Sequence, residues 1–285
     1  MQMLSDTQKE EMELEDKRIK ENLSKIKFKI MVLSGKGGVG KTTISVNLAS
    51  CLQQHKYRTG ILDADITGPN VAKIFNIGSV IETDGRKIIP FLQNGIKVVS
   101  LGGMINADDP VIWRGPLRSK LLNQFIADTE WGELDVFIID LPPGTGDEII
   151  TIGQKIKPDM AIIVTIPHEL ALADSNRAIN MAKKMDIPKI ALIENMAGFK
   201  CPNCESVVDI FGFGGGESQA LESGIDFLGR LPVCLEFNYG VDWQKPFVKS
   251  DIQNEILSIV SKIEGYMPPN ISKGKNIHIL HSENN

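Results

Sequence analysis

The sequence predicts an α/β fold in which a doubly wound, mostly parallel sheet is flanked by helices. Runs of Ile, Val and Leu recur along the chain without polar alternation, a pattern typical of strands buried on both faces of a parallel sheet. Segments with helical periodicity separate these runs, as in βαβ units. At 285 residues and 42% hydrophobic content, the chain is long enough for one large α/β domain.

The expected elements follow in order along the chain. Continuous apolar runs predict strands over residues 28–33, 59–63, 96–101, 136–139, 160–166, 189–194 and 226–231. Apolar periodicity predicts helices over residues 42–52, 115–129, 169–185, 217–223 and 252–264. Asp84-Gly85 separates the apolar pairs 80–81 and 88–89, which predicts a short β-hairpin at the edge of the sheet.

Both ends of the chain differ from the domain expected over residues 27–265. Acidic and basic side chains alternate in residues 1–26, which predicts a charged helical extension that docks weakly on the domain. Residues 266–285 are rich in Pro, Gly, Asn, Ser and Lys, which predicts a flexible tail.

Composition narrows the class of protein. The formal net charge is −5, from 31 basic and 36 acidic residues, so no basic excess favours a nucleic acid or an anionic membrane as partner. No apolar run approaches the ~20 residues that span a bilayer, and the charged N-terminus has no apolar signal region. We therefore expect a cytoplasmic protein, and in a reducing compartment its four cysteines do not form a disulfide scaffold.

A glycine-rich segment follows the first expected strand and precedes the first expected helix. It fits the pattern G-x-x-x-x-G-K-[ST], which in this strand–loop–helix setting predicts a phosphate-binding loop. Glycine lets the backbone curl around phosphates, and the loop N–H groups and the helix N-terminus then face the anion. We expect Lys41 to reach the β- and γ-phosphates and the Thr42 hydroxyl to bind Mg²⁺. The expected nucleotide-binding set is Gly35, Lys36, Gly37, Gly38, Val39, Gly40, Lys41, Thr42 and Thr43.

Aspartates end two other expected strands. Four apolar residues precede Asp140, the Walker B pattern, so we expect Asp140 to hold Mg²⁺ through water. The Pro- and Gly-rich residues 141–147 then form a shaped loop, assigned as a switch. Asp63 and Asp65, one residue apart, cannot both be buried unpaired, and a switch loop beside Mg²⁺ and water would use them. Helix capping and structural pairing are the alternative for either residue.

The expected base pocket is less well defined by the sequence. Asn195 closes a later strand, where its amide can pair with adenine, although the residue suits a turn equally well. Pro232 and residues 236–247 follow in the same region.

Cys201 and Cys204 form a C-x-x-C pair whose glycine-flanked loop favours metal ligation over thioredoxin-like redox chemistry. Closed zinc sites and 4Fe–4S clusters usually take four protein ligands, and this pair supplies two. Cys51 and Cys234 suit small apolar fillers, and no His stands at a zinc-ligand spacing. The missing ligands would then come from a second chain across a two-fold axis.

The loop has an additional lysine, Lys36, and with it resembles the deviant Walker A loop of the MinD/ParA/nitrogenase iron-protein class, the SIMIBI-type P-loop NTPases. The resemblance implies an ATP-dependent homodimer in which Lys36 crosses the interface to the partner's nucleotide. It implies that Asp65 faces the γ-phosphate and orients water, so that Lys36, Lys41 and Asp65 serve catalysis. Asp63 supports the metal side, and Asn195 and Pro232 match the base pocket of the class.

Across about residues 27–263, the order of these motifs, with C-P-N-C and then F-G-F-G-G-G-E, resembles the Mrp/ApbC-type iron–sulfur cluster carriers. This resemblance implies a dimer that bridges one labile 4Fe–4S cluster through Cys201 and Cys204 of both subunits. It implies slow ATP hydrolysis coupled to cluster delivery to apo-proteins. The alternatives are a positioning or partitioning ATPase of the same class, a dimer with a structural zinc, and a P-loop ATPase with an unoccupied cysteine pair.

Overall fold

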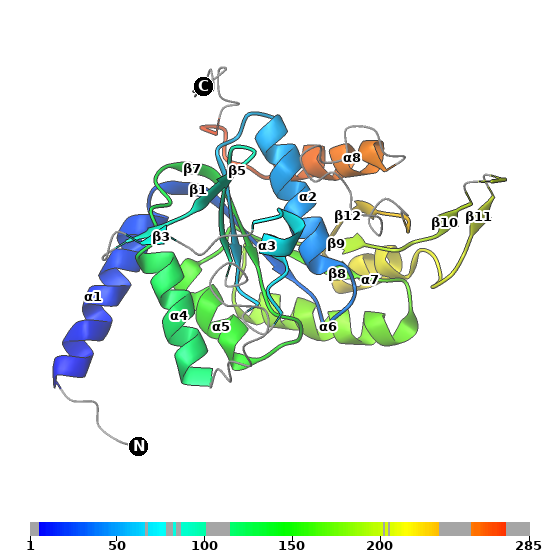
Figure 1. Ribbon diagram of the computed structural model, residues 1–285. Helices are drawn as coiled ribbons and strands as arrows, with labels where there is room; N and C mark the ends of the chain where they lie inside the picture. The colour runs from blue at the N-terminus through cyan, green and yellow to red at the C-terminus, as the bar shows by residue number, and fades with distance from the viewer. Residues whose placement is uncertain are drawn as a thin grey trace, which may run out of the picture.

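The computed structural model describes residues 6–65, 68–77, 82–83, 87–100, 115–201, 203–204, 206–233 and 252–271. Eight strands form one sheet with helices on both faces (Figure 1). In spatial order they are β12 (Asp226–Arg230), β9 (Lys189–Glu194), β8 (Met160–Thr165), β1 (Ile26–Leu33), β7 (Leu134–Asp140), β2 (Thr59–Asp63), β6 (Ile96–Ser100) and β5 (Phe91–Gln93). Every neighbouring pair is parallel except β5 with β6, which confirms the doubly wound, mostly parallel sheet.

The central strand β1 shows why continuous apolar runs were required. Ile30 and Val32 point into a core on one face of the sheet, while Met31 and Leu33 point into a second core on the other face. All four side chains are fully buried. Burial of each side chain contributes about 1.5–3 kcal/mol to the stability of the fold. A polar residue facing either side of the sheet would therefore weaken it.

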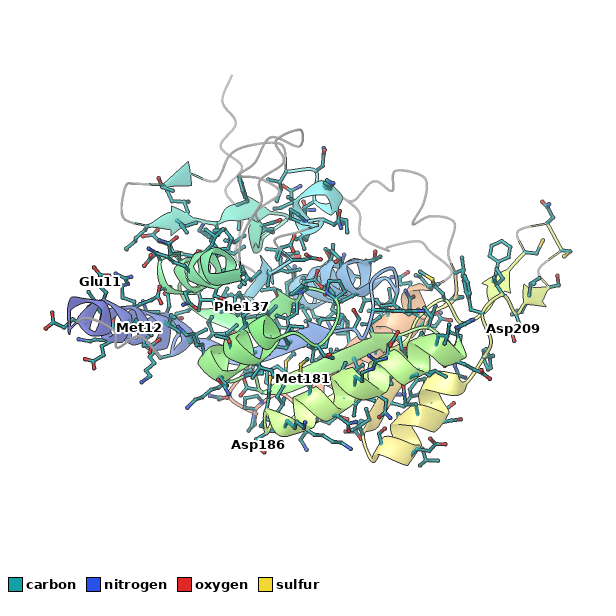
Figure 2. All side chains as sticks on the ribbon, turned by 90° about the horizontal axis from the view of Figure 1, so that it is seen from below. Glu11, Met12, Phe137, Met181, Asp186 and Asp209 are labelled. Carbon is teal, nitrogen blue, oxygen red and sulfur yellow. The ribbon has the colours of Figure 1, made fainter. Side chains whose placement is uncertain are left out.

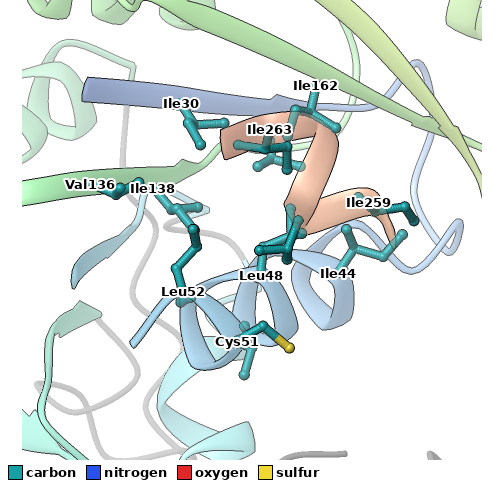
Figure 3. Close-up of a cluster of buried hydrophobic side chains, with 14 of the residues drawn as sticks. Ile30, Ile44, Leu48, Cys51, Leu52, Val136, Ile138, Ile162, Ile259 and Ile263 are labelled. Atoms are coloured by element: carbon teal, nitrogen blue, oxygen red, sulfur yellow. The ribbon is translucent and has the colours of Figure 1, made fainter. Parts of the chain in front are cut away.

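Helices α2 (Lys41–Gln54), α3 (Val71–Ile74) and α8 (Gln253–Glu264) cover one face of the sheet. Figure 3 shows Ile263 of α8 beside the strand residues Ile30 and Ile162, and Ile259 of α8 beside Ile44 of α2, in this core. The other face is covered by α1 (Asp6–Leu23), α4 (Gly115–Ala127), α5 (Asp147–Ile156), α6 (Glu169–Lys184) and α7 (Gly215–Ser223).

The end of the N-terminal helix α1 is built into the domain. Ile19 and Leu23 are buried in the second core, whereas Met12 stays half exposed. The Asn22 side chain donates hydrogen bonds of 2.8–3.0 Å to the carbonyl oxygens of Ile126, Ala127 and Thr129 at the end of α4. The docking of α1 is therefore more extensive than its charged sequence indicates.

Two short elements differ from expectation. The expected hairpin exists, with β3 (Glu82–Thr83) paired to β4 (Ile88–Ile89). The two strands form a separate small sheet, however, and not the edge of the main sheet. Its turn at residues 84–86 lies outside the described residues. The edge of the main sheet is instead β5, which turns into β6 through Asn94 and Gly95 with φ angles of 51° and 81°. Positive φ at both residues is the type I′ geometry that Asn-Gly favours.

Parts of the C-terminal region also lie outside the description. Residues 272–285, most of the expected tail, and residues 236–247, expected near the base, are not described. Ile271, the last described residue, is buried against the α2 side of the sheet. Across the described parts of the chain, every helix is too short or too polar to cross a bilayer.

Candidate functional site

The candidate site lies where β1, β2 and β7 end. These strands are parallel neighbours, and the register places Asp140 beside Val32 of β1 and Asp63 of β2. The loops that follow parallel strands all lie at the C-terminal ends of the strands, where α/β folds bind ligands. The glycine-rich loop and both aspartate segments, far apart in the sequence, therefore meet at one place.

The glycine-rich loop needs its glycines at two kinds of position. Gly38 and Gly40 have φ angles of 81° and 86°, in the left-handed region that glycine adopts without strain. Gly35 lies directly against the backbone of α6 at Asp174, so any Cβ there would overlap it. Gly40 precedes the first residue of α2, and no side chain caps that helix, so its first N–H groups face an incoming anion.

Asp140 is the centre of a buried hydrogen-bonded cluster. Its Oδ1 accepts from Lys41 Nζ at 2.7 Å and from Ser45 Oγ at 2.7 Å, and its Oδ2 accepts from Thr42 Oγ1 at 2.6 Å. Asp140 is fully buried and Lys41 is 6% exposed. The structure thus brings together three of the expected site residues and adds Ser45, which the sequence pattern did not single out.

Asp63 is also buried, and its carboxylate is already hydrogen bonded. Oδ2 accepts from Ser100 Oγ at 2.8 Å and from the Val71 N–H at 3.1 Å, and Oδ1 accepts from the Asp65 N–H at 3.2 Å. Burial, followed by the nearby charge of Asp140, raises the pKa of Asp63 to about 7. These contacts support the capping and pairing interpretation of Asp63, because they fix the start of α3 and the loop after β2.

Asp65 lies on that loop and is less buried than Asp63. Its Oδ1 accepts from the Gly68 N–H at 3.1 Å. Residues 66–67 are outside the described part of the chain.

The carboxylate and hydroxyl oxygens of Asp140 and Thr42 are a suitable donor set for Mg²⁺, which prefers oxygen ligands together with water and phosphate. Their 2.6 Å separation places both oxygens at one point beside the phosphate loop. The residues present therefore fit the cation that the loop motif implies.

The expected switch after β7 packs on the phosphate loop. The Gly144 N–H donates to the Ser34 carbonyl oxygen at 2.9 Å, and Pro143 lies close to Gly37. The Ser34 hydroxyl is buried without a partner among the described residues. Helix α5 begins at Asp147, the last residue of the expected switch, so the loop ends one residue earlier than expected. A change at the phosphates can thus reach the switch and α5 through direct contacts.

Lys36 lies on the same loop and is partly exposed. No described residue forms an ion pair or hydrogen bond with its side chain, in contrast to Lys41. Within the described part of the chain, its charge is therefore unpaired.

An apolar cavity of about 360 Å³ opens beside Gly40 and the first turns of α2. Asn195 and Pro232, both expected at the base, lie in its wall, and Thr43 lines it from α2. The Asn195 Nδ2 donates to the Val39 carbonyl oxygen at 2.8 Å, so Asn195 also holds the phosphate loop. The cavity lies within the size range of small-ligand sites, and it adjoins the phosphate loop as a base pocket must.

The cysteine pair lies on a hairpin formed by β10 (Phe199–Lys200) and β11 (Val207–Val208), which projects from the domain (Figure 1). Figure 2 shows Asp209, just after β11, at the opposite end of the molecule from Met12 of α1. The Cys201 N–H donates to the Ser206 carbonyl oxygen at 2.9 Å, which closes the hairpin loop. The hairpin was not predicted, because each strand has only two residues.

Cys204 is exposed and Cys201 is partly buried. The Cys204 sulfur lies 2.9 Å from the Ser206 hydroxyl, and this contact is the main cause that lowers the pKa of Cys204, followed by the Ser206 backbone and Cys201. Within the described residues, no group of three or more His, Cys, Asp and Glu side chains has a metal-binding arrangement. Within the described part of the chain, the hairpin therefore offers two cysteine ligands.

Cys51 lies in the core on α2, as expected for an apolar filler (Figure 3). Burial raises the pKa of Cys51 to about 11, so it remains a thiol. Cys234, the other expected filler, is outside the described residues.

Glu194 anchors the glycine segment that follows the hairpin, a role that the sequence did not indicate. It is fully buried, and its carboxylate accepts the Gly214 N–H at 3.1 Å and the Gly216 N–H at 2.5 Å. Arg230 approaches the same carboxylate at 3.5 Å. Since Glu194 directly precedes Asn195, the end of β9 contacts both the phosphate loop and the segment beyond the cysteines.

Comparisons with known proteins show which family this chain resembles. The family model described as "ParA: NUBPL iron-transfer P-loop NTPase" matches residues 25–267. The iron–sulfur cluster carrier protein of Pyrococcus furiosus is 51% identical over 243 residues, which cover 81% of this chain and 82% of that protein.

Two solved structures are similar to this chain. A nucleotide-binding protein from Archaeoglobus fulgidus, solved in complex with ADP, aligns at TM-score 0.71 and 36% identity, over 83% of this chain and 94% of that one. The cell division protein MinD of Aquifex aeolicus aligns at TM-score 0.59 and 19% identity, over 85% of this chain and 99% of that one. The second similarity concerns the fold alone.

Proposed function

The chain belongs to the family of NUBPL iron-transfer P-loop NTPases, and on this premise we propose that it is an ATP-binding iron–sulfur cluster carrier. Two copies hold one 4Fe–4S cluster between them and transfer it to apo-proteins. The observation that carries the proposal is the pair Cys201 and Cys204, partly buried and exposed respectively, on a hairpin that projects from the domain that holds the phosphate loop.

Ligand number supports a cluster shared by two chains. A 4Fe–4S cluster takes four cysteine thiolates, and one hairpin offers two. A two-fold axis beside the hairpin brings in the second pair without any further motif. The lowered pKa of Cys204 favours the thiolate, which is the form that binds iron.

The nucleotide side follows from the buried cluster at Asp140. The loop N–H groups and Lys41 bind the phosphates, with Lys41 exchanging its contact with Asp140 for the β- and γ-phosphate oxygens. Mg²⁺, held by Thr42 and Asp140 when bound, neutralises phosphate charge. Asp65 orients the attacking water, and Lys36 of the opposite chain stabilises charge on the phosphates.

ATP hydrolysis serves as a slow switch for cluster transfer. The switch after β7 contacts the phosphate loop. Asn195 donates to Val39 of the same loop, and its neighbour Glu194 accepts from Gly214, which follows the cysteine hairpin. A nucleotide can alter cluster lability only by binding two forms of the dimer with different affinity. The contacts at the end of β9 provide a physical route for such a difference.

Anaerobic reconstitution with iron and sulfide tests the proposal. We expect four irons and four sulfides per dimer, with the visible absorption of a 4Fe–4S cluster. Cys201→Ala and Cys204→Ala lose the cluster and keep ATP binding, while the core variant Cys51→Ala keeps both. A colourless product that binds zinc, or a full cluster in either hairpin variant, contradicts the shared-cluster model. DNA and liposome co-sedimentation test the alternative of a positioning or partitioning ATPase, and we expect neither to bind.

A further inference from the structure

The segment F-G-F-G-G-G after the cysteine hairpin has a place in the nucleotide site. Phe211 lines the apolar cavity beside the phosphate loop, together with Asn195 and Pro232. We propose that Phe211 contacts the nucleotide base and couples its presence to the position of the hairpin that carries Cys201 and Cys204. This inference rests on the proposed function, because it assigns the cavity to the base of the bound nucleotide.

The cavity wall includes both ends of the hairpin. Met196 precedes the hairpin and Phe211 follows it, and both line the cavity. Val233, another lining residue, donates from its N–H to the Gly198 carbonyl oxygen at 2.8 Å. A bridge also joins Phe199, the first residue of β10, to Val233. A group that fills the cavity would therefore contact residues on both sides of the hairpin, each three residues from the nearest strand.

Phe211 is held at the wall by its own segment. The Gly212 N–H donates to Asp209 Oδ1 at 2.6 Å, and Gly212 has a φ angle of 103°, which only glycine adopts without strain. Gly212 also packs closely on the Pro167 carbonyl oxygen, where a Cβ would be crowded. Downstream, the buried Glu194 fixes Gly214. The ring is thus presented by a restrained turn on both sides.

The chemistry of the wall suits a nucleobase. An aromatic ring beside an apolar cavity can stack on the flat face of a base or meet its edge, and both arrangements are favourable for π-systems. Phe211 is 37% exposed, so part of its ring is free for contact. Gly40 of the phosphate loop and Phe211 both line this one cavity, so phosphates at Gly40 and a base against Phe211 would occupy one continuous site.

Phe213 provides a matched control. It belongs to the same segment and is 59% exposed, but it does not line the cavity. Its ring lies under the Arg230 guanidinium at 4.3 Å from the ring centroid. Truncation of Phe213 therefore removes an aromatic ring from the same segment without removing a base contact.

The first experiment compares two anionic probes on the full-length, cluster-free protein. ATP carries phosphates and a base, whereas inorganic triphosphate carries phosphates alone. We expect Phe211→Ala to weaken ATP binding at least about tenfold and to leave triphosphate binding unchanged. Phe213→Ala leaves both unchanged. Unchanged ATP affinity in Phe211→Ala, or an equal loss for ATP and triphosphate, overturns the base contact. If the wild-type protein bound neither ATP nor triphosphate, the nucleotide site itself would be refuted instead.

Phe211→Leu is a control for misfolding of Phe211→Ala, because leucine keeps most of the apolar volume and removes only the aromatic ring. We expect this variant to unfold at the wild-type temperature and to lose ATP affinity to an intermediate extent. Wild-type ATP affinity in Phe211→Leu overturns the aromatic contact.

The second experiment measures coupling through the rate at which iodoacetamide alkylates Cys204. In wild-type protein we expect saturating ATP to change this rate, whereas triphosphate does not. In Phe211→Ala, ATP at saturation no longer changes it, while Phe213→Ala behaves as wild type. An alkylation rate independent of ATP in wild-type protein overturns the coupling. Because no cluster is present, this result does not depend on the iron and sulfide measurement that tests the carrier function.

Discussion

Lys41 Nζ lies 2.7 Å from Asp140 Oδ1, and neither side chain has appreciable exposure. Lys41 lies in the first turn of α2, and Asp140 is the last residue of β7. The parallel sheet brings these two positions together at the C-terminal ends of its strands. Lys41 neutralises the buried Asp140 carboxylate, which would destabilise the fold if it were unpaired. Lys41 also lies at the end of the phosphate loop, where α2 begins. The lysine that we propose to bind the nucleotide phosphates thus also forms a buried ion pair in the fold.

This relationship predicts the behaviour of Lys41→Met and of a second change that rescues it. Lys41→Met leaves the buried Asp140 without its counter-charge, and we expect a loss of about 3–5 kcal/mol in the free energy of unfolding. Adding Asp140→Asn removes the unpaired charge and restores part of that loss. Urea denaturation without nucleotide measures both effects, and a double variant less stable than Lys41→Met would contradict the argument. Neither variant should bind ATP.

A second prediction separates the two hydroxyls that contact Asp140. Thr42→Val removes a proposed Mg²⁺ ligand, so ATP hydrolysis should need at least about tenfold more Mg²⁺ for half-maximal rate. Ser45→Ala removes a hydrogen bond to the same carboxylate, at 2.7 Å, without removing that ligand. We expect Ser45→Ala to keep the wild-type Mg²⁺ requirement and to lose about 1–2 kcal/mol of stability. Equal Mg²⁺ requirements in the two variants would refute the assignment of Thr42.

Most of the fold could be predicted because buried parallel strands leave an unbroken apolar signal. The runs that became β1, β7 and β8 are buried along nearly their whole length. The short strand β5 was missed, although Asn94-Gly95 is a hairpin signal that could have revealed it. Helix α5 was not predicted, because the Pro- and Gly-rich loop signal extends up to Asp147, where the helix starts.

The site was predictable where the chemistry lies in consecutive residues. The phosphate loop and Asp140 carry recognisable local patterns, and the fold brings them into hydrogen-bond contact. Ser45 and Glu194 could not be found in this way, because their partners lie far away in the sequence. Glu194 is recognisable only once α7 is placed with its first N–H groups over the end of β9.

A third prediction concerns acid stability. Burial alone would raise the pKa of Asp135, but hydrogen bonds from Arg58 and Lys27 outweigh it and lower the pKa from 3.8 to about 2. The folded protein therefore keeps this carboxylate charged at pH values where the unfolded chain takes up a proton. The resulting stabilisation is complete above about pH 4 and is lost as the pH falls towards 2.

Asp135→Asn removes that stabilisation and should lower the free energy of unfolding at neutral pH by about 2 kcal/mol. It also flattens the pH dependence between pH 4 and pH 2. Glu133→Gln is the control, since Glu133 binds the same Arg58 at 2.6 Å but is 74% exposed, and such pairs contribute under about 1 kcal/mol. Thermal unfolding across this pH range measures both variants, and an unchanged pH slope in Asp135→Asn would count against the ion pair.

The last prediction follows from the contrast between the two lysines of the phosphate loop. Lys41 is paired within its chain, whereas Lys36 has no ion pair or hydrogen bond with any described residue. If Lys36 reaches the nucleotide of a second copy, Lys36→Ala keeps ATP affinity in the monomer but loses ATP-induced dimerisation and hydrolysis. Lys184→Ala, at an exposed position on α6, should change none of these. Sedimentation with and without ATP separates the outcomes. A Lys36→Ala protein that still dimerises with ATP as wild type does would place the role of Lys36 within its own subunit.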